Sequence, residues 1–166
     1  MSNIAIHQNQ FPDTAIQKLE KSEAKIVRAS FPTEANPRIS QMTPEQTGKL
    51  VTAIAAKVAI RLGVFRDEDE QALINREINA DLMKFPSLTE TEILRALING
   101  LDGAYLREGS FVYFTPSNFV QWIKAYIEQE KKPVMKKVAQ LTHQTTNPLP
   151  EPSEKEKLKI LHRHFK

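Results

Sequence analysis

Residues 111–126 carry the densest aromatic run of the chain: Phe111-Val112-Tyr113-Phe114-Thr115-Pro116-Ser117-Asn118-Phe119-Val120-Gln121-Trp122-Ile123-Lys124-Ala125-Tyr126. The run holds six of the twelve aromatic residues, including the only tryptophan. Thr115 and Pro116 are typical of an N-cap and a first helical residue. Apolar side chains then recur on one helix face, at Phe119, Trp122, Ile123, Tyr126 and Ile127. Aromatic side chains can also stack on nucleic-acid bases, but this spacing favours a buried helix.

The segment before the aromatic run predicts further helices. Thr43-Pro44-Glu45-Gln46 matches a capping box, in which the Thr hydroxyl and the Gln amide bond the open amides of a first turn. Gly63 provides a stop for that helix. A second helix is expected to begin near Asp67, because the positive end of a helix dipole stabilises a run of four acidic residues there. Phe85-Pro86 is expected to end this helix.

A third helix starts at a second capping box, Thr89-Glu90-Thr91-Glu92, and the glycines Gly100 and Gly103 end it. Residues 105–113 fit either a small β-hairpin or an irregular loop. After the aromatic helix, Pro133 is expected to kink or end the helix, and a basic helical segment follows to Leu141.

These patterns predict an all-α fold: a compact bundle of four to five helices, with room for one small hairpin, between flexible ends. We expect a leader with a short helix over residues 1–42, the helical domain over 43–141, and a proline-rich spacer with a short final helix over 142–166. The predicted core consists of Leu50, Ile54, Val58, Leu73, Ile78, Leu82, Ile93, Leu97, Phe119, Trp122, Ile123 and Tyr126.

Charge is distributed unevenly along the chain. Residues 1–65 carry a net charge of +3, residues 66–108 of −5, and residues 109–166 of +5. This pattern fits an acidic face for one partner and a basic tail for nucleic acid or a second partner, and it also fits ordinary solvated surface. Because DNA affinity depends on neutralising phosphates, the candidate nucleic-acid-binding residues are Lys124, Lys131, Lys132, Lys136 and Lys137.

Signatures of catalysis are missing from the sequence. The chain has no cysteine, only five glycines and no phosphate-binding loop, and its histidines lie in the predicted ends, at His7, His143, His162 and His164. The acidic run at residues 67–70 suggests a metal site at first sight, but consecutive carboxylates on a helix diverge. We therefore expect no enzyme activity, no cofactor and no metal. No signal peptide or membrane span is visible, so we expect a cytoplasmic protein without a membrane partner.

The layout of residues 47–130 resembles known helical proteins. It places a capped helix and an acidic helix before Phe85-Pro86-Ser87-Leu88-Thr89, then a Gly- and Tyr-containing loop, and finally Phe119-x-x-Trp122-Ile123-x-x-Tyr126. This is similar to small helical proteins of phages and mobile elements, and to the N-terminal domain of phage replicative helicase loaders. The resemblance implies a compact helical domain with a flexible tail that contacts the helicase.

Three functional hypotheses follow. The first is a non-enzymatic accessory protein of phage or mobile-element DNA replication, a helicase loader or adaptor that acts by protein–protein contacts with a replicative helicase. The second is a direct DNA-binding protein that uses the basic C-terminal helix. The third is a phage structural protein. The sequence leaves the oligomeric state open.

Overall fold

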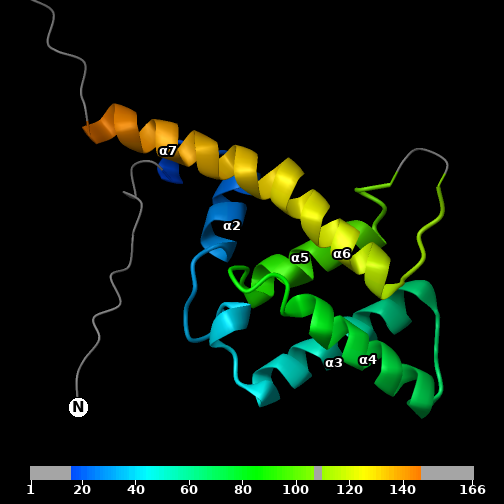
Figure 1. The fold of residues 1–166 in the computed structure, drawn as a ribbon. Helices are drawn as coiled ribbons and strands as arrows, with labels where there is room; N and C mark the ends of the chain where they lie inside the picture. The colour runs from blue at the N-terminus through cyan, green and yellow to red at the C-terminus, as the bar shows by residue number, and fades with distance from the viewer. Residues whose placement is uncertain (1–15, 107–109, 147–166) are drawn as a thin grey trace, which may run out of the picture. The chain divides into compact units, whose positions relative to one another are not determined.

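The computed structural model describes residues 16–106 and 110–146, and these ranges are helical with no strand or sheet (Figure 1). The elements are α2 (Lys21–Ala29), a 3-10 turn η1 (Ile39–Gln41), α3 (Pro44–Leu62), α4 (Glu68–Leu82), α5 (Glu90–Leu101), α6 (Pro116–Ala125), a π-helical segment η2 (Tyr126–Lys131) and α7 (Lys132–Thr146). The predicted all-α fold class is confirmed.

The chain divides into two units, and each is described by itself. The larger unit runs from Leu19 to Met135 and contains α2 to η2 with the first residues of α7. The smaller unit consists of residues 1–18 and 136–166, of which the described part includes the remainder of α7. The core and the surfaces analysed below belong to the larger unit.

The predicted capping boxes start α3 and α5. At α3, the Thr43 amide donates to Gln46 Oε1 at 2.8 Å, and the Gln46 amide donates to Thr43 Oγ1 at 3.2 Å. At α5, the Thr89 amide donates to Glu92 Oε2 at 3.0 Å, and the reciprocal bond reaches Thr89 Oγ1. Gly63 ends α3 in the left-handed region, with φ 65°. Both boxes and the glycine stop are confirmed.

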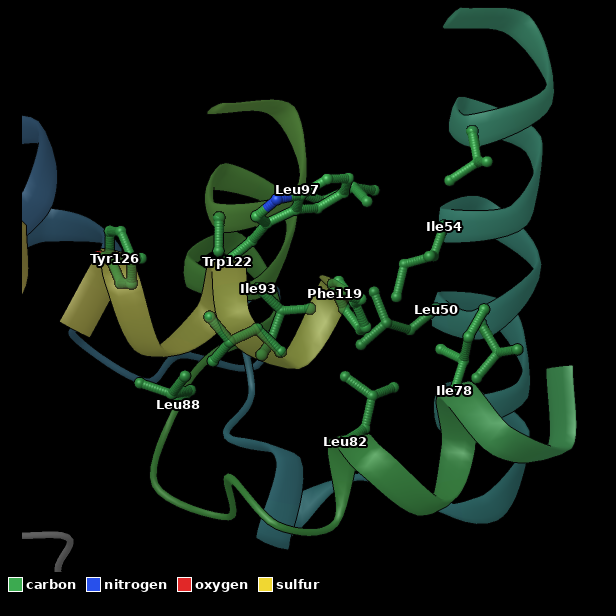
Figure 2. Close-up of a cluster of buried hydrophobic side chains, with 14 of the residues drawn as sticks. Leu50, Ile54, Ile78, Leu82, Leu88, Ile93, Leu97, Phe119, Trp122 and Tyr126 are labelled. Atoms are coloured by element: carbon green, nitrogen blue, oxygen red, sulfur yellow. The ribbon is translucent and has the colours of Figure 1, made fainter. Parts of the chain in front are cut away.

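The core forms where α3 and α4 meet α5 and α6. Figure 2 shows side chains from α3 and α4, among them Leu50 and Leu82, directed toward Phe119 of α6 and Ile93 of α5. Phe119 and Ile93 are fully buried. Of the twelve predicted core residues, all but Leu73 are buried.

Leu73 is the exception, since 53% of its surface is exposed. The apolar stripe of α4 runs through Ile74, Ile78 and Leu82, which are spaced by four residues and so share one face. Leu73 is turned about 100° from Ile74 on a helix. The assignment of Leu73 to the core was wrong, because the neighbouring Ile74 occupies the buried face.

Gly100 has a different role from the predicted helix stop. It lies inside α5, which continues to Leu101, and it is buried against Trp122 of α6. A Cβ atom at Gly100 would lie 2.1 to 2.5 Å from three atoms of the indole ring, far closer than atoms can approach. The missing side chain therefore lets the Trp122 ring lie directly on the backbone of α5. The left-handed position that follows the helix is Gly103, with φ 80°.

The folded unit begins earlier than predicted. Residues 1–42 were assigned to a leader, whereas the larger unit starts at Leu19 and includes α2. Val27 of α2 is fully buried, and the Thr89 hydroxyl of α5 donates to the Ala29 carbonyl at 2.6 Å. A nine-residue helix is too short to be stable alone in water, so these contacts hold it.

The loop after α5 contains no strand among its described residues. Ala104, Tyr105 and Leu106 form turns and a bend, and residues 110–115 have no regular structure. Residues 107–109, the centre of the hairpin alternative, lie outside the described residues. Residues 142–146, the start of the predicted spacer, continue α7, and the rest of the spacer and the predicted final helix lie outside the described residues, as do His7, His162 and His164.

Pro133 does not end the helix that starts at Pro116. α6 passes into the π-helical segment η2, and α7 continues through Pro133 to Thr146. Proline lacks an N–H and its ring displaces the carbonyl four residues earlier, which belongs to Gln129 in η2. A π turn spans five residues instead of four. At the predicted interruption the backbone hydrogen bonding changes from the α to the π pattern, and the helix continues.

Replacement of Gly100 by alanine should destabilise the protein, by about 1–3 kcal/mol, because the new methyl group collides with Trp122. Gly48 provides a matched control. It lies within α3, and a Cβ there meets nothing within 4 Å. Gly48→Ala should therefore stabilise the protein by about 0.5–1 kcal/mol. Urea denaturation of both variants measures the two effects, and a Gly100→Ala protein as stable as the parent would refute the close contact.

Candidate functional site

The five lysines proposed for nucleic acid do not form one free cationic surface. Lys124 and Lys136 are exposed, and neither has a carboxylate partner among the described residues. Lys132 is exposed and pairs with Glu128 one turn earlier, at 2.6 Å. Lys137 is half-buried. Lys131 points to the interior, and only 20% of its side chain is exposed.

Lys131 neutralises a fully buried carboxylate. Its ammonium lies 2.8 Å from Oε1 of Glu92, whose side chain is completely shielded from solvent. The Ser30 hydroxyl donates to the same oxygen at 2.7 Å, and the Tyr126 hydroxyl does so at 3.3 Å. The Thr89 amide donates to the other oxygen. A buried charge needs both an opposite charge and hydrogen bonds, and Glu92 has both.

Tyr126 donates its proton within this cluster. Burial, and next the negative charge of Glu92, raise the pKa of the Tyr126 phenol far above its usual value of 10. The phenol therefore stays protonated over the physiological range, so it acts as a donor to Glu92 and cannot serve as a base.

A second carboxylate joins α5 to the end of the aromatic helix. Glu130 accepts from Arg95 Nε at 3.0 Å and from Asn99 Nδ2 at 2.7 Å, and the Tyr105 hydroxyl also donates to it. Burial, followed by the hydrogen bond to Glu130, raises the pKa of Tyr105 well above its usual value. This group too remains a neutral donor.

The two clusters are structural in their geometry. Among the described residues, every buried side-chain nitrogen or oxygen has a hydrogen-bond partner. The described ranges also contain no group of three His, Asp or Glu side chains arranged to hold a metal ion.

An exposed apolar surface lies at the turn from α3 to α4. We call it the α3–α4 tip and define it by Ile60, Val64 and Phe65 together with the acidic residues 67–70. Ile60 is 79% exposed and Phe65 is 84% exposed. The turn lies at the edge of the larger unit, where α3 passes into α4 (Figure 1).

The acidic residues of the tip have no cationic partner in the described part of the chain. Asp67 caps α4 by accepting from the Glu70 amide at 2.8 Å, and Glu68, Asp69 and Glu70 are exposed in the first turn. The helix dipole favours this placement. The tip therefore combines exposed apolar side chains with a net negative charge, since Arg66 offsets only one of the four acidic residues that follow it.

Sequence reasoning identified the acidic run but not the apolar part of the tip. The only available signal was Val64-Phe65, placed directly after the Gly63 stop and outside any helical stripe. An apolar pair in a loop is as often buried as exposed, so the sequence could not establish its exposure.

No helix in the described ranges combines the length and the apolar composition needed to cross a bilayer.

The raised pKa of Tyr126 predicts a loss of stability in alkali. Below pH about 10 the phenol is protonated in both states, and above it the folded protein keeps a proton that the unfolded chain loses. The free energy of unfolding should then fall with rising pH, by up to about 1.4 kcal/mol per pH unit for one proton. Tyr126→Phe should remove this part of the slope.

Urea denaturation at several pH values between about 8 and 11 measures that slope. Tyr113→Phe is the matched control, because Tyr113 is 61% exposed, and it should leave the slope unchanged. Equal slopes for the parent and the Tyr126→Phe protein would contradict the assignment.

Comparison of the chain with protein-family models, curated proteins and solved structures gave no match. The resemblance to phage helicase loaders accordingly stays a prediction. The functional argument rests on the residues themselves, of which the α3–α4 tip and the exposed lysines remain available for a partner.

Proposed function

We propose that this chain is a non-enzymatic accessory protein that acts by protein–protein contacts, and that the α3–α4 tip docks on a basic segment of its partner. The observation that carries the proposal is the exposure of Phe65 and Ile60 beside carboxylates without cationic partners in the described residues. From the resemblance in layout we further propose that the protein takes part in DNA replication of a phage or mobile element and that its partner is a replicative helicase.

The composition of the tip favours a protein partner. Large aromatic side chains contribute most of the binding energy at many protein interfaces, and Phe65 is such a side chain in an exposed turn. The carboxylates of residues 67–70 would steer a basic segment toward it and would repel the phosphates of DNA. A basic and partly apolar helicase segment satisfies both features.

The interior supports a binding role over a catalytic one. The buried carboxylate of Glu92 and the partly buried one of Glu130 each have several partners, and the phenols of Tyr126 and Tyr105 remain neutral donors. These groups rigidify the fold, which suits a module that presents a fixed surface.

Binding of a purified hexameric replicative helicase to the immobilised protein tests the proposal. Truncation of an interface hot spot costs about 2 kcal/mol or more, so Phe65→Ser should raise the Kd about 30-fold. Met83→Ser is the matched control. Met83 is also an apolar residue with 50% of its surface exposed, and it lies at the C-terminal end of α4, away from the tip. The control should bind as the parent does.

Absence of binding by the parent protein would exclude the helicase as the partner. Equal losses in the Phe65→Ser and Met83→Ser proteins would show that the tip is not the docking surface.

Direct DNA binding is a second candidate, favoured by the exposure of Lys124 and Lys132 in the larger unit and of Lys136 in the smaller one. Their joint replacement by glutamine should abolish salt-sensitive binding and lower the salt slope by about one per lysine that contacts a phosphate. Lys131 must be left in place, because its removal would leave Glu92 buried without a counter-ion.

Fluorescence anisotropy of labelled single- and double-stranded DNA at low and moderate salt measures this effect. A parent protein that binds neither DNA at high micromolar concentration would eliminate the DNA-binding candidate.

A further inference from the structure

A groove open to solvent lies between α2 and α5, which contact each other in the larger unit. Its volume is about 650 Å³. One wall is formed by Lys25 and Arg28 of α2, and the floor contains Leu94 and Ile98 of α5. We call it the α2–α5 groove.

The groove has a positive wall. Lys25 and Arg28 are three residues apart and so share one face of α2. Both are exposed, and neither has an ion-pair partner among the described residues. Arg95 also lines the groove, but its charge is offset by Glu130. None of the described lining residues is acidic.

The two asparagine side chains that line the groove are already engaged in building it. Asn36 donates to the Ala29 and Phe31 carbonyls and accepts from the Thr91 amide at 2.9 Å. Asn99 donates to Glu130 and Tyr105. The groups left for a ligand are therefore the two cations of α2, the Thr91 hydroxyl and the aliphatic floor.

This chemistry selects against nucleic acid. The lining contains no aromatic side chain on which a base could stack, and two net positive charges on one helical turn do not follow a phosphate backbone. A ligand that fits must place one or two carboxylates beside an apolar side chain. Such a combination is characteristic of a protein segment.

The α3–α4 tip has this combination. Phe65 projects from the turn as an exposed apolar side chain, and Glu68 and Asp69 follow within one helical turn. The tip and the groove cannot meet within one molecule, because the α3–α4 turn and α2 lie at opposite edges of the larger unit (Figure 1). A tip that enters the groove must belong to another copy.

We propose that the α2–α5 groove binds the α3–α4 tip of a second copy of this chain. Phe65 lies on Leu94 and Ile98, while Glu68 and Asp69 of the incoming copy pair with Lys25 and Arg28. The two surfaces differ, so the contact is head-to-tail and propagates into a ring or an open chain. This inference and the proposed function both use the α3–α4 tip. The groove has no part in the proposed function.

Charge reversal on each side tests this contact. A groove variant carries Lys25→Glu and Arg28→Glu, and a tip variant carries Glu68→Lys and Asp69→Lys. Both sets of positions are exposed, and the capping residue Asp67 is kept. Sedimentation velocity from low to high micromolar protein at low salt measures association.

The parent should associate with rising concentration and dissociate with added salt. Each variant alone should stay monomeric, because its two surfaces then carry the same sign. An equimolar mixture should associate again, with the two variants alternating, because the negative groove of one variant fits the positive tip of the other and the parental groove and tip also remain complementary.

A parent that remains monomeric at high micromolar concentration overturns the inference, as does a groove variant that associates like the parent. Circular dichroism checks that the variants fold, and the neutral pair Lys25→Gln with Arg28→Gln replaces the groove variant if it does not. Helicase binding separates this inference from the proposed function, since the groove variant retains the intact tip and should still bind.

Discussion

The buried carboxylate of Glu92 is the interaction on which the arrangement of the larger unit depends. It accepts from Ser30 after α2, from the amide of the N-cap residue of α5 and from Tyr126 in η2, and it pairs with Lys131. These elements are distant in sequence, and one charged group brings them together. Removing any one donor would leave part of the charge without compensation in a region without solvent, which costs more than the loss of an ordinary hydrogen bond. The residue therefore specifies where α2 docks and how η2 is oriented.

The capping box at the start of α5 explains why the sequence predicted only part of the role of Glu92. Glu92 is the third residue of a capping box, and its bond to the Thr89 amide follows from that local pattern. Local patterns of this kind depend on neighbours a few residues away, so they were predicted and are confirmed at Thr43 and Thr89. The second oxygen of Glu92 serves partners 34 to 62 residues away. Such long-range partners leave no trace in the periodicity of a single sequence.

The same distinction separates the correct and incorrect predictions for the core. Strong stripes such as Phe119 to Tyr126 were assigned correctly, because each residue sits at helical spacing from several others. The prediction that Leu73 is buried was wrong, because its neighbour Ile74 lies on the buried face of α4. Gly100 resembled a stop signal, yet its function is to admit the ring of Trp122, which only the packing of α5 on α6 reveals. Residues 19–42 belong to the larger unit because α2 docks on α5, and the hydrogen bond that joins them links residues 60 positions apart, which no local pattern indicates.

Charge counts along the sequence need the same correction before they support a function. In the acidic segment, Glu92 is internal, Asp102 pairs with Arg61, and Asp81 pairs with Lys84. In the basic segment, Lys131 and Lys132 are likewise paired. Paired charges contribute little to the field that a distant partner experiences, since their opposite signs cancel beyond a Debye length. The charges without an ion-pair partner among the described residues include the acidic residues of the tip and, on α2, Lys25 and Arg28. Any recognition by this unit is therefore expected to depend on these few residues and not on its net charge.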